Sequence, residues 1–301
     1  MDRRAWMGLA LRAGAAVLLR RQAPIIGSVI VTDRCSLHCQ HCAVANLRRI
    51  DYPFPVVQAD LRAMFDAGVR VVLLYGGEPT LWRDGDLRLA DVVAEARHIG
   101  FPLVGVVTNG LRGTAMPGVD LVLVSVDGTR AHHDLIRGPT YDRVMAGLDV
   151  APPRSACLYM AVNRINVEDI EAVGDLARRH PAVRGVAFNL HTPYPGTEHL
   201  ALVPEQRRDA LRRIGALKRA GAPVLDLVSA LPAIAQGSVA LPCAQCVVRE
   251  DGHQWVCGRC VEVPGLCGQC GFLFAGELAQ VFAGRPRVVL EAARTYGAML
   301  R

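Results

Sequence analysis

Residues 25–42 of the chain read IIGSVIVTDRCSLHCQHC, and this stretch decides the fold. The apolar, β-branched run at 25–31 predicts a buried strand, and three cysteines follow it, Cys35, Cys39 and Cys42. Thiolates spaced C-x3-C-x2-C suit one corner of a [4Fe–4S] cluster, for which four thiolates are the usual full set. With three thiolates, one iron stays open, as a catalytic zinc keeps an open position. A zinc ion with a histidine of the same stretch as its fourth ligand, His38 or His41, is the alternative.

The same kind of apolar run recurs along the chain, with helical patterns between the runs. Nearly continuous apolar strands are typical of a parallel sheet that is covered on both faces. We therefore predict an α/β fold, an open or partial barrel of six βα units. The predicted strands are 25–31, 70–75, 102–107, 120–126, 157–163 and 184–190. The predicted helices are 55–67, 86–99, 140–150, 167–180 and 203–220.

Each predicted strand is followed by a polar, glycine-bearing or cysteine-bearing loop. In parallel α/β barrels, functional residues gather in the loops at the carboxyl ends of the strands. The sequence therefore predicts one mouth that collects the reactive groups. After the cysteine stretch, these loops are Gly76–Pro79 (GGEP), Thr108–Gly110 (TNG), Ser125–Gly128 (SVDG), Asn163–Asn166 and His191–Gly196.

The C-x3-C-x2-C motif after the first strand and Gly-Gly-Glu-Pro after the second resemble the radical S-adenosylmethionine (SAM) superfamily over about residues 24–200. The resemblance implies a partial (βα)6 TIM-like barrel in which Cys35, Cys39 and Cys42 ligate a [4Fe–4S] cluster. It implies that SAM chelates the open iron. Reduction by a donor such as flavodoxin or ferredoxin would then cleave SAM to a 5′-deoxyadenosyl radical, which takes a hydrogen atom from the substrate.

The resemblance also assigns SAM contacts to residues of these loops. Glu78 is expected to accept from the SAM ammonium, and Ser125 with Asp127 to hold the ribose or the methionine carboxylate. Asn189 and Leu190 are expected to border the adenine, while His41 stands where the family usually has an aromatic residue. The full expected set is His41, Gly76, Gly77, Glu78, Pro79, Thr108, Asn109, Ser125, Asp127, Arg137, Asn163 and Leu190.

Two residues or groups keep two interpretations, and two others have one expected role. Arg137, in the string His132-His133-Asp134 to Arg137, either helps to position SAM or substrate or pairs with Asp134 at the surface. His191 and Tyr194 are either proton donors or, the favoured interpretation, packing residues of their loop. Cys157 is expected to be a buried thiol. The arginines near Glu205 and Asp209 are expected to form a solvated helix face, at positions 207, 208, 212 and 213.

Six further cysteines form three C-x2-C pairs near the carboxyl terminus. Asp251-Gly252, flanked by Val247-Val248 and Trp255-Val256, predicts a hairpin. This region resembles the auxiliary-cluster regions, SPASM or twitch, that follow many radical SAM barrels. The resemblance implies an auxiliary [4Fe–4S] cluster on Cys246, Cys257, Cys267 and Cys270, with Cys243 and Cys260 as spares or ligands of a second site. A structural zinc site is the alternative, because paired C-x2-C is also a zinc signature.

Composition limits the remaining function classes. The net charge is +6, but 33 of the 34 basic residues are Arg, which indicates compositional bias rather than nucleic-acid binding. The sequence has no stretch of about 18 uninterrupted apolar residues, so no membrane-spanning helix is predicted. Metal-binding thiolates indicate a reducing compartment, so a cytoplasmic protein is expected. The predicted organisation is an N-terminal helical segment (1–21), a barrel (22–222), a linker (223–242), a cysteine-rich metal-binding region (243–272) and a helical tail (273–301).

These expectations favour an enzyme that modifies a peptide or a natural-product precursor. The alternatives are a lipid or isoprenoid substrate, a non-catalytic zinc or iron–sulfur scaffold on the same fold, and a simple electron-transfer protein. The apolar, basic N-terminal segment is expected to be a packing helix, and a membrane-surface contact is the alternative. Cobalamin-dependent methylation is disfavoured, because no separate cobalamin domain is expected before the barrel.

Overall fold

A computed structural model describes residues 8, 11, 14–19, 24–237, 239, 247–256 and 263–299. Its centre is a curved sheet in the order β10-β9-β1-β2-β5-β6-β7-β8, in which the six strands from β1 to β8 run parallel. The six predicted strands are confirmed, each boundary within one residue. Their bounds are β1 (Ile26–Thr32), β2 (Val71–Gly76), β5 (Leu103–Thr108), β6 (Leu121–Ser125), β7 (Ala156–Val162) and β8 (Val183–Leu190).

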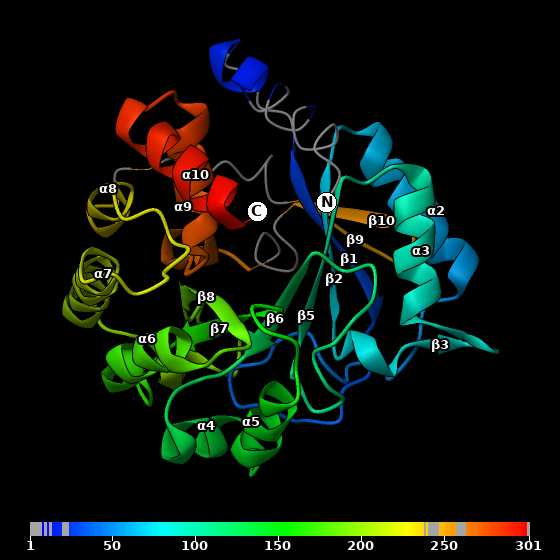
Figure 1. The fold of residues 1–301 in the computed structure, drawn as a ribbon, viewed down its shortest axis with the longest axis horizontal. Coiled ribbons are helices and arrows are strands. Elements are labelled where there is room, and N and C mark those ends of the chain that lie inside the picture. The colour runs from blue at the N-terminus through cyan, green and yellow to red at the C-terminus, as the bar shows by residue number, and fades with distance from the viewer. Residues whose placement is uncertain are drawn as a thin grey trace.

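Helices surround the sheet on its outer side (Figure 1). The five predicted helices are confirmed as α2 (Phe54–Asp66), α3 (Leu89–Ile99), α5 (Tyr141–Asp149), α6 (Ile170–Arg179) with the 3-10 turn η2 (Val167–Asp169) before it, and α7 (Pro204–Arg219). Helix α3 begins three residues later than predicted, because Arg83–Asp84 (β3) and Leu87–Arg88 (β4) form a small hairpin around Gly85. Short 3-10 turns lie at Pro79–Leu81 (η1) and Glu198–Leu200 (η3).

Helix α4 (Arg130–Arg137) was not predicted. It is only eight residues long and mostly polar, which is too short a window for apolar periodicity to predict a helix. It is held instead by a side chain from elsewhere in the chain, described below.

Packing follows the alternation of side chains along the strands. On β7, Leu158, Met160 and Val162 are fully buried in a core cluster with side chains of α6 and α7. Side chains of opposite parity face the interior of the barrel, where the Asn189 amide of β8 donates a hydrogen bond to the Tyr159 hydroxyl of β7. The predicted partial barrel is therefore confirmed.

The carboxyl-terminal part adds two strands to the first edge of the sheet. The predicted hairpin is confirmed as β9 (Val247–Glu250) and β10 (His253–Val256). Strand β9 pairs in parallel with β1, from Gly27 with Val247 to Ile30 with Glu250, and this pairing was not predicted. Figure 1 shows this hairpin beside β1.

The other edge of the sheet, β8, is covered as well. Val186 forms a β-bridge with Val224, and the Leu190 N–H donates to the Gly271 carbonyl at 2.8 Å. Helix α8 (Leu231–Ala235) lies between Val224 and Gly271 in the sequence. The predicted helical tail, which is interrupted at Gly284–Pro286, forms α9 (Leu273–Phe282) and α10 (Pro286–Met299). The segment after α7 therefore protects both edges of an open barrel, which would otherwise expose unpaired backbone.

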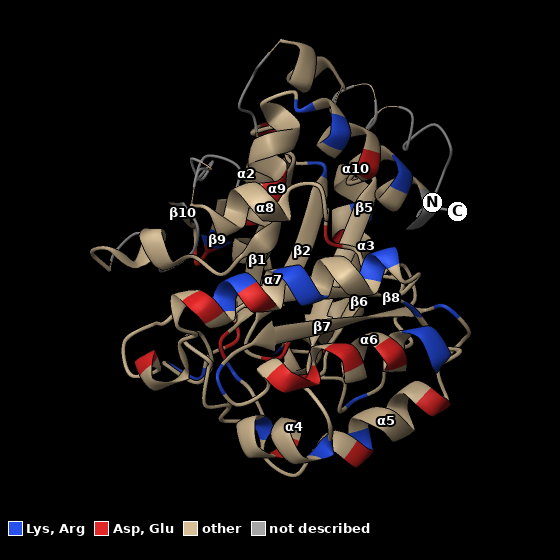
Figure 2. Cartoon of the chain, turned by 90° about the vertical axis from the view of Figure 1, so that its left-hand side faces the viewer, with Lys and Arg blue, Asp and Glu red and all other residues tan. Residues whose placement is uncertain are grey.

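The charged residues of α7 have two different surroundings. Figure 2 shows acidic and basic residues along this helix. Arg208 and Arg212 are exposed and pair with Glu205 and Asp209, as expected for a solvated face. Arg213 is turned toward α6, where it pairs with Glu171, so the expectation of a solvated face is wrong for this residue.

Residues 14–18 are helical in the part of the N-terminal segment that the structure describes. No helix among the described residues is both long and apolar enough to cross a membrane.

Candidate functional site

The three cysteines Cys35, Cys39 and Cys42 lie in the loop after β1, and each is half-buried. Two polar side chains shape this loop. The Asp33 carboxylate accepts backbone N–H groups from Arg48, from Arg49 at 3.1 Å and from Ile50 at 2.6 Å. Asn46 accepts from the Cys35 N–H at 3.0 Å and donates to the Leu37 carbonyl at 2.9 Å. These hydrogen bonds give the loop a defined shape.

The thiols share one electrostatic environment. The pKa of the Cys39 thiol is raised to about 11, chiefly by burial; Arg137 opposes this rise, and the neighbouring Cys42 and Cys35 contribute to it. Burial also raises the pKa of Cys35, and Cys42 adds to that rise. Thiols that affect each other in this way lie around one site. A bound metal would replace their protons, since the thiolate is the ligand.

The donor set fits a cluster better than a single ion. His38 lies against Arg49, with Nε2 and Nη2 3.4 Å apart, and the Nε2 of His41 lies 3.6 Å from an oxygen of Asp127. In the part of the chain that the structure describes, no three His, Cys, Asp or Glu side chains converge as ligands of one metal ion. Ligands of a cubane cluster surround it rather than meet at one point, because each binds its own iron.

The two glycines after β2 are required by the backbone of the cysteine loop. A Cβ atom on Gly76 would overlap the Thr32 carbonyl oxygen, and one on Gly77 would overlap the Arg34 carbonyl oxygen. Gly77 N–H donates to the Thr32 carbonyl at 2.8 Å, and Glu78 N–H donates to the Arg34 carbonyl at 2.7 Å. The Gly-Gly-Glu motif is therefore bonded along its backbone to the chain just before Cys35.

The Glu78 carboxylate is 1% exposed and has four protein donors. Its Oε1 accepts from Thr80 N–H at 3.1 Å, Thr80 Oγ1 at 2.6 Å and Thr108 Oγ1 at 2.8 Å, and its Oε2 accepts from Asn109 N–H at 2.7 Å. These bonds tie the loop after β2 to the end of β5. Pro79 is buried at the start of η1, next to this carboxylate. A contact between Glu78 and an ammonium remains a prediction.

Asp127 and Arg137 form a buried ion pair. The Arg137 Nε donates to an Asp127 oxygen at 2.5 Å, and the side chains are 10% and 0% exposed. Burial favours the neutral acid, but Arg137, His41 and the Ala161 N–H together outweigh burial, and the pKa of Asp127 is lowered. The other Asp127 oxygen accepts from Ala161 N–H at 2.8 Å. Of the two interpretations of Arg137, surface pairing with Asp134 is therefore wrong, because its partner is Asp127.

The other predicted residues near the mouth differ in their contacts. Ser125 is buried at the end of β6. The ring of His41 lies 6.5 Å from that of His191, and burial lowers the pKa of His41 to about 4, so it is neutral at pH 7. His191 is buried with its Nε2 3.1 Å from the Thr197 carbonyl and hydroxyl, which fits the packing interpretation. The Leu190 side chain packs in the core.

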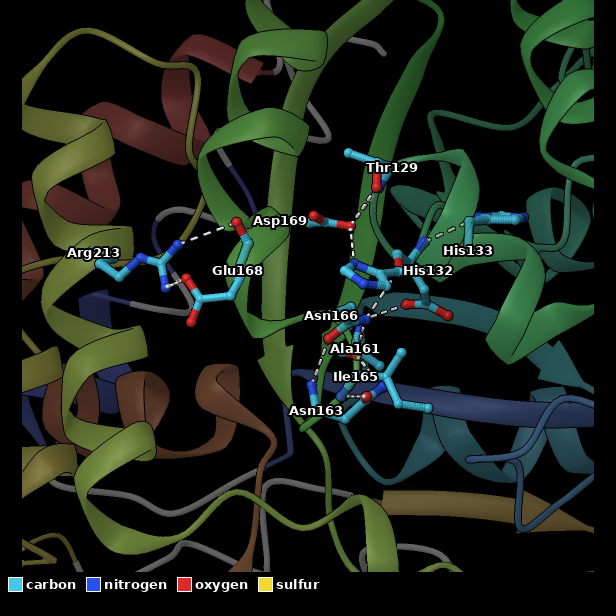
Figure 3. Close-up of polar contacts among 11 residues, drawn as sticks. Thr129, His132, His133, Ala161, Asn163, Ile165, Asn166, Glu168, Asp169 and Arg213 are labelled. Atoms are coloured by element: carbon cyan, nitrogen blue, oxygen red, sulfur yellow. Dashed lines mark hydrogen bonds and ion pairs between the residues drawn. The ribbon is translucent and has the colours of Figure 1, made fainter.

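Asn163 is fully buried and bonded within its own loop. Its Oδ1 accepts from Ile165 N–H at 2.9 Å and its Nδ2 donates to the Ala161 carbonyl at 3.2 Å. Nearby Asn166 donates to the Asp127 carbonyl at 3.1 Å, so this loop supports the Asp127 backbone. Figure 3 shows both side chains turned into the same polar network.

The carboxyl-terminal cysteines are divided by what the structure describes. Cys267 and Cys270 are half-buried, and Cys267 lies in the 3-10 turn η6 (Leu266–Gln269). Gly271 N–H donates to Thr192 Oγ1 at 2.9 Å and Leu273 N–H to Asn189 Oδ1 at 2.8 Å, which fixes this segment at the mouth end of β8. Cys243, Cys246, Cys257 and Cys260 lie outside the described residues.

Several supporting residues were missed at the sequence level. Arg207 of α7 donates to the Cys270 carbonyl at 2.9 Å and is not part of a solvated face. Asp33, Asn46 and Asp169 act through contacts with backbone distant in sequence, for which no local motif exists. Of these residues, only Asp33 could have been singled out from the sequence, because it is a carboxylate just before the cysteine motif.

Comparison with known proteins agrees with this geometry. Residues 29–177 match the family model described as the radical SAM superfamily. The chain contains a radical SAM domain. This domain begins in β1 and ends in α6, so it includes the cysteine loop, the Gly-Gly-Glu motif and the Asp127 loop.

Relatives of the radical SAM domain are named for cofactor biosynthesis and for an enzyme activity. The chain is 25% identical over 209 residues to molybdenum cofactor biosynthesis protein 1 of Drosophila melanogaster, covering 60% of this chain and 36% of the relative. It is 28% identical over 201 residues to a probable GTP 3′,8-cyclase of Methanopyrus kandleri, covering 62% of each. The chain thus spans less than two thirds of these curated relatives. The predicted enzyme class is confirmed at the level of the superfamily.

The fold is shared with solved structures. SuiB of Streptococcus suis, bound to its precursor peptide SuiA, matches with a TM-score of 0.63 at 14% identity. The match covers 94% of this chain and 70% of SuiB. At this identity the likeness establishes the fold alone, and it extends beyond the radical SAM domain into the segment that follows α7.

Proposed function

We propose that this protein is a radical SAM enzyme whose Cys35, Cys39 and Cys42 hold a [4Fe–4S] cluster with one iron open to SAM. The observation that carries this proposal is the thiol site itself. Three half-buried thiols lie on one loop that is held by Asp33 and Asn46 and bonded to the Gly-Gly-Glu motif. When bound and reduced, the cluster would supply the electron that cleaves SAM to a 5′-deoxyadenosyl radical.

The residues around the mouth would bind SAM and shield the site. We assign to Glu78 the negative charge that faces the SAM ammonium, and to Ser125 the ribose. Asp127 accepts from Arg137 through one oxygen and from Ala161 through the other, so its contribution would be to order the loop beside the ribose. His41, neutral at pH 7, would contact the adenine as a flat, uncharged ring.

The carboxyl-terminal cysteines would hold an auxiliary cluster, with Cys246, Cys257, Cys267 and Cys270 as ligands. Two placements support this assignment. Val247 and Val256, which are adjacent in sequence to Cys246 and Cys257, pair across the hairpin. Cys267 and Cys270 belong to a segment bonded to the mouth end of β8. A group held there would lie on the substrate side of the barrel.

For the substrate, we propose a peptide or other natural-product precursor. Support comes from the shared fold with SuiB, whose structure contains a precursor peptide. A small-molecule precursor of a cofactor is the second candidate, because the matched relatives are named for molybdenum cofactor biosynthesis and GTP cyclisation. Activity on a peptide encoded beside the gene would favour the first, and activity on a purine nucleotide the second.

The test of the proposed chemistry is SAM cleavage under anaerobic conditions. Reconstituted protein with dithionite should form 5′-deoxyadenosine, and the variant with Cys35, Cys39 and Cys42 replaced by Ala should form none. Cys157→Ala is the matched control, because this thiol is fully buried in β7 away from the mouth; it should retain cleavage. Equal 5′-deoxyadenosine from the triple variant would overturn the proposal.

A further inference from the structure

One cation lies against a cysteine of the barrel motif. The Arg137 Nη1 is 3.9 Å from the Cys39 sulfur, and the Arg137 side chain is 10% exposed. Its Nε is held by Asp127 at 2.5 Å. The guanidinium therefore has one edge on a carboxylate and another directed at a predicted cluster ligand, a geometry that its rigid fork of donors permits.

Helix α4, which carries Arg137 at its last position, is fixed at both ends. At its start, the Asp169 carboxylate accepts from Thr129 N–H at 2.7 Å and Thr129 Oγ1 at 2.8 Å, and lies 2.8 Å from His132 Nδ1. Figure 3 shows Asp169 turned toward both residues. At its end, the Ile136 carbonyl accepts from Gln40 N–H at 3.0 Å, and Gln40 lies between Cys39 and Cys42 in sequence. The helix is thus a fixed arm that joins the barrel wall to the cysteine loop.

A second side-chain donor provides a comparison. The Asn109 Nδ2 lies 3.9 Å from the Cys35 sulfur, the same distance as Arg137 from Cys39. Asn109 is neutral, whereas Arg137 carries a full positive charge in a buried position. Because opposite charge acts more strongly where water is excluded, the two contacts are unequal, and Arg137 is the dominant one.

We propose that Arg137, held by Asp127 and directed at Cys39 by the fixed helix α4, sets the reduction potential of the barrel cluster. The inference rests on the proposed function, since it requires that the three thiols hold a cluster. One electron from an external reductant takes the cluster from its 2+ to its 1+ state, and Arg137 keeps its proton throughout. A nearby cation and an N–H donor to a ligand sulfur both favour the more negative, reduced state.

The test is an EPR-monitored redox titration of the full chain without SAM. Replacing Cys267 and Cys270 by Ala in every sample leaves the barrel cluster as the EPR signal that is followed. In Arg137→Gln the ratio of reduced to oxidised cluster at a fixed ambient potential should fall about tenfold, equivalent to a midpoint about 59 mV lower. Arg137→Lys, which keeps the charge, should stay within about threefold of the parent.

The matched control is Arg213→Gln. This arginine is also paired with a carboxylate and mostly buried, but it lies between α7 and α6. Its removal changes the net charge equally and should leave the ratio unchanged. If Arg137→Gln fails to fold because Asp127 loses its partner, the double variant Arg137→Gln/Asp127→Asn is compared with Asp127→Asn alone, and its ratio should be lower than in that single variant.

Two results separate the failure of this inference from the failure of the proposed function. If the parent shows no reducible cluster signal, the proposed function is wrong and the inference falls with it. If the parent shows the signal but the ratio in Arg137→Gln stays within twofold of the parent, Arg137 does not set the potential. Where Arg137→Gln is unfolded, the same conclusion follows if the double variant stays within twofold of Asp127→Asn. In that case the proposed cluster would remain supported.

Discussion

The two cysteine groups of this protein are held in different ways. The barrel thiols lie on a loop whose backbone N–H groups are bonded to Asp33 and Asn46 and whose sides contact Asn109 and Arg137. The described carboxyl-terminal pair, Cys267 and Cys270, belongs to a segment attached through backbone contacts of Gly271 and Leu273. The first site is built by side chains, whereas the second is attached to the edge of an existing sheet.

This difference indicates which site depends on which. The side chains that shape the barrel loop, Asp33, Asn46, Asn109 and Arg137, all belong to the barrel, so the loop forms together with the sheet. Arg48 adds a contact with Asp251 of the hairpin. The carboxyl-terminal segment needs a finished β8 and β1 to bind. We therefore expect that a substitution in the barrel loop leaves the carboxyl-terminal site intact only if the sheet still folds. A substitution in the carboxyl-terminal segment should affect that segment alone.

The largest expected effect comes from a reciprocal pair of glycine variants. Gly77→Ala places a Cβ against the Arg34 and Asp33 carbonyls, which are backbone atoms that cannot turn away. Gly271→Ala does the same against the Leu190 carbonyl. Each should destabilise its own region by about 3 kcal/mol. Measured by iron content, Gly77→Ala should lose the barrel cluster, and Gly271→Ala should lose the carboxyl-terminal metal alone.

The control for both variants is Gly268→Ala, since nothing lies within 4 Å of its added Cβ. It should retain the iron content of the parent. If Gly271→Ala also abolished the barrel cluster, the two sites would not be independent, and the contrast between them would fail.

A smaller effect concerns SAM binding. Glu78→Gln removes the negative charge that we assign to the SAM ammonium. It also presents an NH2 group to Thr80 or Asn109, whose donors face a carboxylate in the parent. SAM affinity should fall by one to two orders of magnitude, about 1.5–3 kcal/mol, with the cluster intact. Equilibrium dialysis with labelled SAM measures it. Glu277→Gln, at a buried carboxyl in α9, is the control, and affinity of Glu78→Gln within twofold of the parent would disprove the assignment.

A more modest effect should appear at the bridge between the two regions. The Tyr52 hydroxyl donates to Glu250 of β9 at 2.6 Å and accepts from Arg48 of the cysteine loop at 2.6 Å. Tyr52→Phe should lower the free energy of unfolding by about 1–2 kcal/mol, because a buried carboxylate loses one donor. Urea titration measures this change. A variant as stable as the parent would show that the hairpin does not depend on this bridge.

An effect of similar size is a pH dependence of stability at Asp226, which lies behind β8. Burial raises the pKa of Asp226 to about 7, so its contribution to stability is present below pH 4 and is lost as the pH rises through 7. Asp226→Asn removes this loss and can still accept from Phe188 N–H. The stability of the variant relative to the parent should therefore rise by about 2 kcal/mol between pH 5 and pH 8. An unchanged difference would mean that Asp226 is ionised across that range.

Much of the fold was predictable because its strands are short, apolar and parallel. The runs at 25–31 and 184–190 could be assigned as strands from local sequence, since a strand buried on both faces contains few polar residues. The pairing of β9 with β1 was not predictable in the same way. It joins segments about 220 residues apart, and nothing in either segment encodes the register.

The candidate site was predictable where spacing carries the chemistry and less so where tertiary contacts do. Cys35, Cys39 and Cys42 follow from their spacing. The partner of Arg137 did not, because the sequence offered Asp134 on the same helix while the fold supplies Asp127. Helix α4 was missed for a related reason, since Asp169, more than 30 residues away, holds its first turn.

The central claim is that the barrel thiols leave one iron open to SAM. The most direct measurement is the EPR spectrum of the reduced protein carrying Cys267→Ala and Cys270→Ala, recorded with and without SAM. We predict a [4Fe–4S] signal whose g-values shift when SAM is added, because SAM binds to the open iron. A spectrum that is identical with and without SAM, at a concentration that saturates binding, would contradict the account.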